Sequence, residues 1–237
     1  MYSSTTQSPV LLLGAAHVVD LAEPLRRELD ARTLDGVAIE LDPERARALF
    51  ADQRARGGRD APLFARLWER VQRRLGAEIG GGVPGAEMKA AARFAEERHL
   101  PLFLIDDPIG TTFVELVRTM PFRERVGLLV GAIVALFVPA RLVEREIERY
   151  ADRPDVYTEE LRRSSPTLAR VLLDDRNEHM ADRLASLRGR GYGRLAVVVG
   201  DAHVAGLRAA LRRRGVPVEA IPFRDLRSST GSSPRPS

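Results

Sequence analysis

The sequence predicts an α/β fold with a largely parallel central sheet of about five strands and helices on both faces. Three observations support this prediction. Short apolar runs alternate with longer amphipathic stretches along the chain. The composition, 44% apolar and 30% charged, is that of a globular protein with a substantial core. Cysteine is absent, which excludes a small fold held by disulfides and any metal site made of thiolates.

Each predicted strand is a short apolar run that ends near a turn residue. After the first run, leucines at helical spacing continue until Gly36. Pro43 lies just beyond the second run, where a new helix can begin, and the glycine cluster at 80–85 must form a loop. The expected strands are 10–13, 37–41, 101–105, 195–199 and 218–222, and the expected helices include 21–34, 43–75 and 87–98.

We expect a single α/β domain over residues 1–227. Residues 111–188 are mostly helical in pattern, with a break near Pro154, and are predicted to form a long helical insertion attached to the sheet. Residues 228–237 are rich in serine and proline, and this low complexity predicts a disordered tail.

The charge pattern disfavours nucleic acid as a partner. The formal net charge is only +4, because 37 Lys and Arg residues are offset by 33 Asp and Glu. Almost all the basic residues are arginines interleaved with acids, as in 26–28 and 144–146, which is typical of solvated helix faces. No basic patch rich in aromatic residues accompanies them.

One apolar segment, residues 126–140, raises the question of membrane contact. It holds fifteen uncharged residues between Arg125 and Arg141. As a helix it would extend about 22 Å, short of the ~30 Å hydrocarbon core of a bilayer. A core helix or the face of a homodimer is therefore favoured over membrane contact, which stays the alternative. The first nine residues lack the features of a secretory signal, so we expect a cytoplasmic protein.

A near-repeat at the two ends of the chain is the most informative feature. Residues 11–18 read LLLGAAHV and residues 197–204 read VVVGDAHV, so each apolar strand is followed by Gly-x-Ala-His-Val and a helix. A strand that ends in glycine can turn sharply, which would bring the residue three positions later over its carboxyl end. Ligands of open α/β sheets bind at that edge. His17 and His203 are therefore predicted to face one crevice, although either alone reads as a helix-start residue bonded locally.

Acidic residues are predicted at the same edge. Glu40 places a charge inside an apolar strand, so it needs a cation, a metal or an arginine as partner, and the simplest reading is an ion pair with Arg45. Asp106 and Asp107 end the third strand, where acids either cap a turn or serve a site. Glu87 is either the first-turn acid of its helix or part of the wall of the cleft.

With these residues laid out, the chain resembles the TraB/PrgY family, which groups with the GumN and Tiki proteins. The resemblance covers roughly residues 10–223. Each mark is weak alone, but six in order make a specific signature. They are Gly14-x-x-His17, the strand 37–42 followed by Arg45, Gly85-Ala86-Glu87-Met88, Leu104-Ile105-Asp106, Arg176-Asn177-x-x-Met180 and Gly200-x-x-His203-Val204.

The resemblance implies a fold similar to the erythromycin-esterase and ChaN-like group and a metal-dependent hydrolase site. Tiki proteins look like metalloproteases that use manganese or cobalt, and PrgY proteins are linked to the shutdown of peptide pheromone signals. By position, His17, His203 and Glu40 would bind the metal. Catalytic roles would fall to Glu40, Glu87, Arg45, Arg176 and Asp106.

The leading hypothesis is metal-assisted hydrolysis of a peptide or small molecule. Two imidazoles and a carboxylate suit a divalent ion such as Mn, Co or Zn, which activates water. Glu87 or Asp106 could accept the proton, and Arg45 or Arg176 could hold a substrate carboxylate or an oxyanion. Two alternatives remain open at this point: a metal-free esterase or amidase with a histidine base, and a non-catalytic protein that binds a peptide or an anionic ligand.

Overall fold

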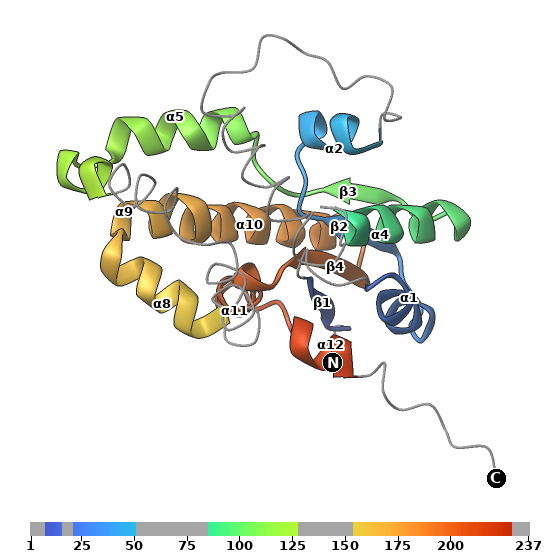
Figure 1. The fold of residues 1–237 in the computed structure, drawn as a ribbon. Helices are drawn as coiled ribbons and strands as arrows, with labels where there is room; N and C mark the ends of the chain where they lie inside the picture. Colours follow the sequence, from blue (N-terminus) through green and yellow to red (C-terminus); the bar gives the residue numbers. More distant parts are fainter. Residues whose placement is uncertain (1–7, 16–20, 51–84, 128–153, 229–237) are drawn as a thin grey trace, which may run out of the picture.

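A computed structural model describes residues 8–15, 21–50, 85–127 and 154–228 (Figure 1). Its sheet has five strands, all parallel, in the order β3-β2-β4-β1-β5. The predicted α/β class is therefore confirmed. The strands are β1 Val10–Ala15, β2 Gly36–Ile39, β3 Leu102–Leu104, β4 Leu195–Gly200 and β5 Val218–Ile221.

The described helices occupy the stretches where the sequence has helical periodicity. Leu25 and Leu29, which share one face of α1, are both buried. The predicted helices 21–34 and 87–98 are confirmed, each with slightly different ends. The helices are α1 Ala22–Asp30, α2 Pro43–Phe50, α4 Ala86–Glu97, α5 Ile109–Thr119, α8 Pro154–Ser164, α9 Pro166–Ala169, α10 Asp175–Gly189, α11 Asp201–Arg213 and α12 Phe223–Ser228.

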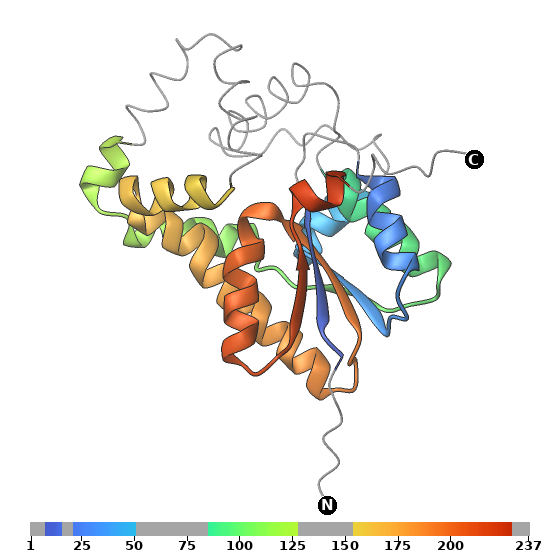
Figure 2. The same cartoon turned by 90° about the horizontal axis from the view of Figure 1, so that it is seen from below.

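Helices cover both faces of the sheet, as the sequence predicts (Figure 2). On one face, α1 and α4 pack against alternate residues of the central strands, such as Leu13, Ile39 and Val198. On the other face, α10 and α11 pack against the intervening residues, such as Leu12 and Val197. Because β1 and β4 are covered on both sides, their residues are apolar without alternation, which is why these strands are easily recognised in the sequence.

Gly14 does not end its strand, contrary to the prediction. β1 continues to Ala15, which pairs with Gly200 of β4. Gly14 is needed for space instead: a Cβ there would lie 2.2 Å from Asp201 Oδ1 and 3.0 Å from the backbone nitrogen of Phe223. Asp201 Oδ1 accepts a hydrogen bond from that nitrogen, so glycine allows the starts of α11 and α12 to approach β1 closely.

The described parts of the expected insertion are mostly helical. Helices α5, α8, α9 and α10 lie within residues 111–188 or at its border, and a π-helical turn, Arg170–Asp174, joins α9 to α10. The helix expected from Pro43 begins there, but its course beyond Phe50 lies outside the described residues, as do 128–140 of the apolar segment. In the part of the chain that the structure describes, every helix is too short or too polar to cross a membrane.

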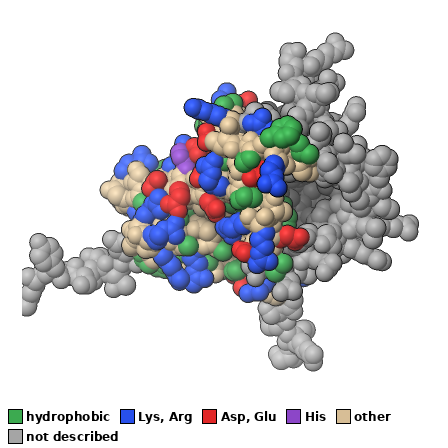
Figure 3. Space-filling model, turned by 90° about the vertical axis from the view of Figure 1, so that its left-hand side faces the viewer, with side chains coloured by type: hydrophobic (Ala, Val, Ile, Leu, Met, Phe, Trp, Pro, Cys, Tyr) green, Lys and Arg blue, Asp and Glu red, His purple; other side chains and the backbone are tan. Residues whose placement is uncertain are grey.

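The surface repeats the charge pattern of the sequence. Figure 3 shows a face on which basic and acidic side chains are interspersed. Among the described residues, many exposed charged side chains are paired: Arg162 contacts Asp174 at 2.8 Å, and Arg170 contacts Asp175 at 2.7 Å. Exposed ion pairs of this kind contribute little to stability. They give these arginines partners within the protein, so the arginines alone do not indicate a ligand.

Candidate functional site

Polar side chains gather at the edge of the sheet where the parallel strands end. Glu40 directly follows β2, Asp106 lies two residues beyond β3, and α11 begins after β4 with His203 in its first turn. Helix α10 begins at the same edge and brings Arg176 to these three residues. We call Glu40, Arg45, Asp106, Arg176 and His203 the Arg176 cluster.

Arg176 is the centre of this cluster. Its Nε and Nη2 donate to the two oxygens of Asp106 at 2.9 and 2.6 Å, and Nη2 also donates to Glu40 Oε1 at 2.5 Å. Its Nη1 lies 3.2 Å from His203 Nε2 and 3.1 Å from the carbonyl oxygen of Leu172. The side chain is only 15% exposed. The guanidinium therefore joins three strand ends through their side chains.

Asp106 is buried, with 1% of its surface exposed, and bound by two arginines. Besides the bidentate contact with Arg176, its Oδ2 accepts from Arg45 Nη1 at 2.7 Å. Burial alone would raise the pKa of Asp106, but the hydrogen bonds and charge of Arg176, with the charge of Arg45, outweigh it and hold the pKa below its ordinary value. A carboxylate in this setting is a weak proton acceptor.

Glu40 is buried and ionised. Burial would raise its pKa, but the interactions with His203 and with the charge of Arg176, together with the Gly200 N–H, outweigh burial and lower the pKa. Its Oε2 accepts the backbone N–H of Gly200 at 2.7 Å. The arginine bonded to Glu40 is Arg176, 136 residues away, whereas the simple pairing with Arg45 expected from the sequence is wrong because Arg45 donates to Asp106.

His203 is a neutral imidazole at neutral pH. Its burial is the largest influence on the pKa and lowers it, so the charged form is disfavoured at neutral pH. Nδ1 lies 2.9 Å from Asn177 Oδ1, and an arginine N–H can only donate to Nε2. Nδ1 therefore carries the proton, and the Nε2 lone pair faces Arg176 and Glu40 Oε1, which is 3.4 Å away.

Two of the sequence-predicted site residues do not appear among the contacts described above. His17 lies outside the described residues; Ala15, two positions before it, pairs with Gly200 at the edge of the site. Glu87 is buried in the first turn of α4, which packs on the opposite face of the sheet from α10. The structure thus brings together Glu40, Arg45, Asp106, Arg176 and His203, but it does not test the pairing of the two histidines.

The remaining acid and histidines have other surroundings. Asp107 Oδ1 lies 2.9 Å from His179 Nε2 of α10, and both side chains are about one-third exposed. His99 follows α4 with a φ of 55°, a left-handed backbone conformation that ends the helix before β3. Asp42 caps α2 by accepting the backbone N–H groups of Glu44 and Arg45 at 2.8 and 3.0 Å.

Asn177 is a site residue that the sequence reasoning missed. It fixes the protonated nitrogen of His203, and Gly206 makes room for it, because a Cβ at Gly206 would lie 2.2 Å from Asn177 Nδ2. Gly206 lies one turn after His203 on α11. Two signals were available in the sequence: the position of Asn177 beside Arg176 and a glycine inside a helix.

Glu40 and His203 fit part of a metal site. A separation of 3.4 Å between Glu40 Oε1 and His203 Nε2 suits two ligands of one ion at bond lengths of roughly 2.0–2.2 Å. A histidine that ligates a metal usually donates its other ring N–H to a fixed acceptor, as His203 does to Asn177. Among the described residues, no three His, Asp or Glu side chains are arranged to bind one ion.

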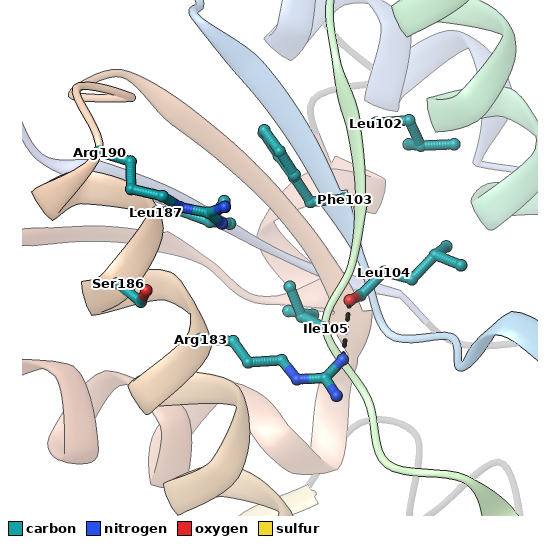
Figure 4. Close-up of a pocket in the computed structure, with 8 residues that line it drawn as sticks. All are labelled: Leu102, Phe103, Leu104, Ile105, Arg183, Ser186, Leu187 and Arg190. Atoms are coloured by element: carbon teal, nitrogen blue, oxygen red, sulfur yellow. Dashed lines mark hydrogen bonds between the residues drawn. The ribbon is translucent and has the colours of Figure 1, made fainter.

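A cavity of about 340 Å³ lies on the outer side of β3, beside α10 (Figure 4). Phe103 and Leu187 line it together with Arg183 and Arg190. Arg183 Nη1 donates to the carbonyl oxygens of Leu104 and Asp106 at 3.0 and 3.3 Å. We call this region the Arg183 cavity. Arg183 bonds main-chain oxygens at the edge of the sheet, whereas Arg176 bonds mainly side chains.

Comparisons with known proteins agree with these features. The profile of the TraB/PrgY/gumN family matches residues 3–220. A similar protein is the uncharacterized protein MJ1365 of Methanocaldococcus jannaschii, 28% identical over 223 residues, which are 90% of this chain and 56% of that protein. The chain thus spans a little over half the length of this relative.

Proposed function

The chain belongs to the TraB/PrgY/gumN family, and from this membership and the geometry at the strand ends we propose that it is a metal-dependent hydrolase. Glu40 and His203 would hold a divalent ion such as Mn, Co or Zn, with His17 as the third ligand. A peptide is the proposed substrate. When bound, the ion supplies Lewis acidity toward water and toward a carbonyl oxygen.

The observation that carries this proposal is the Glu40–His203 pair. A lowered pKa keeps His203 neutral, which is the form that binds metals, and its proton is fixed on Nδ1 by Asn177. A lowered pKa likewise keeps Glu40 ionised. Both atoms that could act as ligands, His203 Nε2 and Glu40 Oε1, are only 3.4 Å apart at the edge where α/β sheets bind ligands.

The other side chains suit different tasks. Asp106 is a poor candidate for a base because both of its oxygens are bonded to arginines, so we assign it the role of holding Arg176 and Arg45. Glu87 remains the candidate for proton transfer. Arg45 is 34% exposed; its Nη1 bonds Asp106 and its Nε lies 3.9 Å from Asp42 Oδ2, so its Nη2 group can hold a carboxylate of the substrate.

The test combines metal binding and turnover. The full chain is stripped with a chelator, reloaded with Mn²⁺, Co²⁺ or Zn²⁺, and incubated with a mixture of peptides whose products are identified by mass spectrometry. We expect turnover that depends on the ion. We also expect His203→Ala, Glu40→Gln and His17→Ala each to abolish both turnover and stoichiometric metal binding.

His179→Ala is the matched control, because His179 is also on the carboxyl-edge side of the molecule but contacts Asp107 instead of Glu40. It should keep both properties. Turnover that persists without any ion would replace the proposal with a metal-free hydrolase. Loss of neither property in the three site variants would rule out this site altogether.

A further inference from the structure

Every N–H group of the Arg176 guanidinium has an acceptor. Nε donates to Asp106, Nη2 donates to Asp106 and Glu40, and Nη1 donates to His203 and to the carbonyl oxygen of Leu172. Five donors therefore meet five acceptors. Two of these acceptors, Glu40 Oε1 and His203 Nε2, are the atoms that would ligate a metal ion.

The two shared acceptors differ in capacity. A carboxylate oxygen has two lone pairs, so Glu40 Oε1 can keep its bond to Nη2 and also bind an ion. A neutral imidazole nitrogen has one lone pair, so His203 Nε2 can serve Arg176 or an ion, but not both. The 3.2 Å contact between Nη1 and Nε2 is thus the single contact that metal binding must break.

The rest of the guanidinium is anchored so that this contact can break alone. The bidentate bond through Nε and Nη2 ties it to Asp106, which is itself buried and bound by Arg45. Leu172, the other acceptor of Nη1, lies in the π-helical turn directly before α10. π-Helical turns are frequent at functional sites, and this one places a carbonyl oxygen within reach of Nη1.

We propose that Arg176 is an internal cation that competes with the metal ion for His203 and so weakens metal binding. This inference rests on the proposed function. Metal uptake would release Nη1 from His203 while Asp106 retains the guanidinium. The charges favour this reading, because Glu40 and Asp106 are already balanced by Arg176 and Arg45, so a divalent ion adds charge to a neutral set.

The test compares Mn²⁺ affinity, measured from the EPR signal of free Mn²⁺, in the full-length wild type, Arg176→Gln and Arg45→Gln. Removing a charge in contact with the ligands should tighten Mn²⁺ binding at least about tenfold in Arg176→Gln. Arg45→Gln is the control, since Arg45 contacts Asp106 and is partly exposed; we expect a change under about threefold there. Equal or weaker binding by Arg176→Gln would overturn the inference.

The outcomes separate this inference from the proposed function. If the wild type binds Mn²⁺, His203→Ala does not, and Arg176→Gln matches the wild type, only the competition is wrong. If Arg176→Gln binds Mn²⁺ and the wild type shows no binding, competition is supported and the resident metal of the proposed function is rejected. If no variant binds Mn²⁺, both are rejected.

A second measurement covers the case in which Arg176→Gln does not fold. Wild-type structures with and without Zn²⁺ should differ in one contact: with Zn²⁺ on His203, the Nη1–Nε2 distance should exceed hydrogen-bond length while both Asp106 contacts persist. A whole side chain that leaves Asp106, or a Zn²⁺ bound elsewhere with the 3.2 Å contact intact, would contradict the proposal.

Discussion

Arg176 and Arg183 lie seven residues apart on α10, so both face the carboxyl end of β3, yet their surroundings differ. Arg176 is mostly buried and bonds mainly side chains, namely two carboxylates and an imidazole. Arg183 lines an open cavity and bonds main-chain oxygens of Leu104 and Asp106 (Figure 4). The partners indicate different roles. Arg176 influences the pKa values of the acids and the histidine that it contacts, whereas Arg183 covers the outer edge of the sheet.

The largest effect should come from replacing each arginine by methionine. Arg176→Met leaves Glu40 and Asp106 buried without their main cation, and we expect a loss of about 3–5 kcal/mol in the free energy of unfolding. Arg183→Met removes hydrogen bonds to two uncharged main-chain carbonyl groups and should lose only about 1–2 kcal/mol. Urea denaturation measures both, and equal losses would break the distinction between the two regions.

The hydrogen bond between Asn177 and His203 gives the next effect. Asn177→Ala leaves the Nδ1–H of a buried imidazole without its acceptor and should lower the free energy of unfolding by about 1–3 kcal/mol. If His203 binds a metal, the metal affinity of Asn177→Ala should also fall about 10–100-fold, as it does when other groups that orient a metal ligand are removed. Ser186→Ala in the Arg183 cavity is the control and should leave both quantities unchanged. Unchanged affinity in Asn177→Ala would show that Asn177 does not position His203.

A smaller loss is expected when the space for Asn177 is filled. The Cβ of Gly206→Ala would lie 2.2 Å from Asn177 Nδ2 and 3.0 Å from its Cγ, so Asn177 must move, at a cost of about 1–2 kcal/mol. Gly189→Ala, at the end of α10 beside the Arg183 cavity, meets nothing within 4 Å and should be neutral or slightly stabilising. Thermal unfolding of both variants checks this, and a Gly206→Ala protein as stable as Gly189→Ala would contradict the packing described for Asn177.

Of these two regions, only the Arg176 cluster should make the free energy of unfolding depend on pH. The pKa of His203 is lowered in the folded state, so below about pH 6.5 the unfolded chain binds a proton that the folded chain does not. The free energy of unfolding therefore decreases as the pH is lowered. The slope approaches at most about 1.4 kcal/mol per pH unit for this one group. The lowered pKa values of Glu40 and Asp106 remove further stability only below about pH 4.5.

Denaturation between pH 7 and pH 5 tests this dependence. His203→Gln should flatten the profile, whereas Ser186→Ala should keep the wild-type profile, because the lining of the Arg183 cavity holds no acid or histidine. A profile in His203→Gln that is as steep as in the wild type would assign the titration to another group.

The sequence predicts the sheet well and the contacts of the site less well. β1 and β4 are buried on both faces and read as continuous apolar runs, so their positions follow from hydrophobicity alone. The role of Gly14 was misread because a close approach between β1, α11 and α12 depends on tertiary structure, and a glycine that makes room looks the same in a sequence as one that turns.

In the site, the sequence identifies Glu40, because a charge inside an apolar strand needs a partner. The sequence does not identify which residue that partner is. Arg176 is 136 residues away from Glu40, while Arg45 is only five, so proximity in the sequence favours the wrong pair. Nothing in the sequence separates Arg176 from Arg183 except the resemblance to the family. The pairing of His17 with His203 stays a prediction, since His17 lies outside the described residues.

The most direct test of the proposed metal site is pulsed EPR on Mn²⁺-loaded protein with ¹⁵N-labelled histidine. The proposal predicts coupling from two imidazole nitrogens in the wild type and in His179→Ala, and no coupling from bound Mn²⁺ in His203→Ala. A Mn²⁺ signal without imidazole coupling, or a coupling that His203→Ala leaves intact, would contradict it.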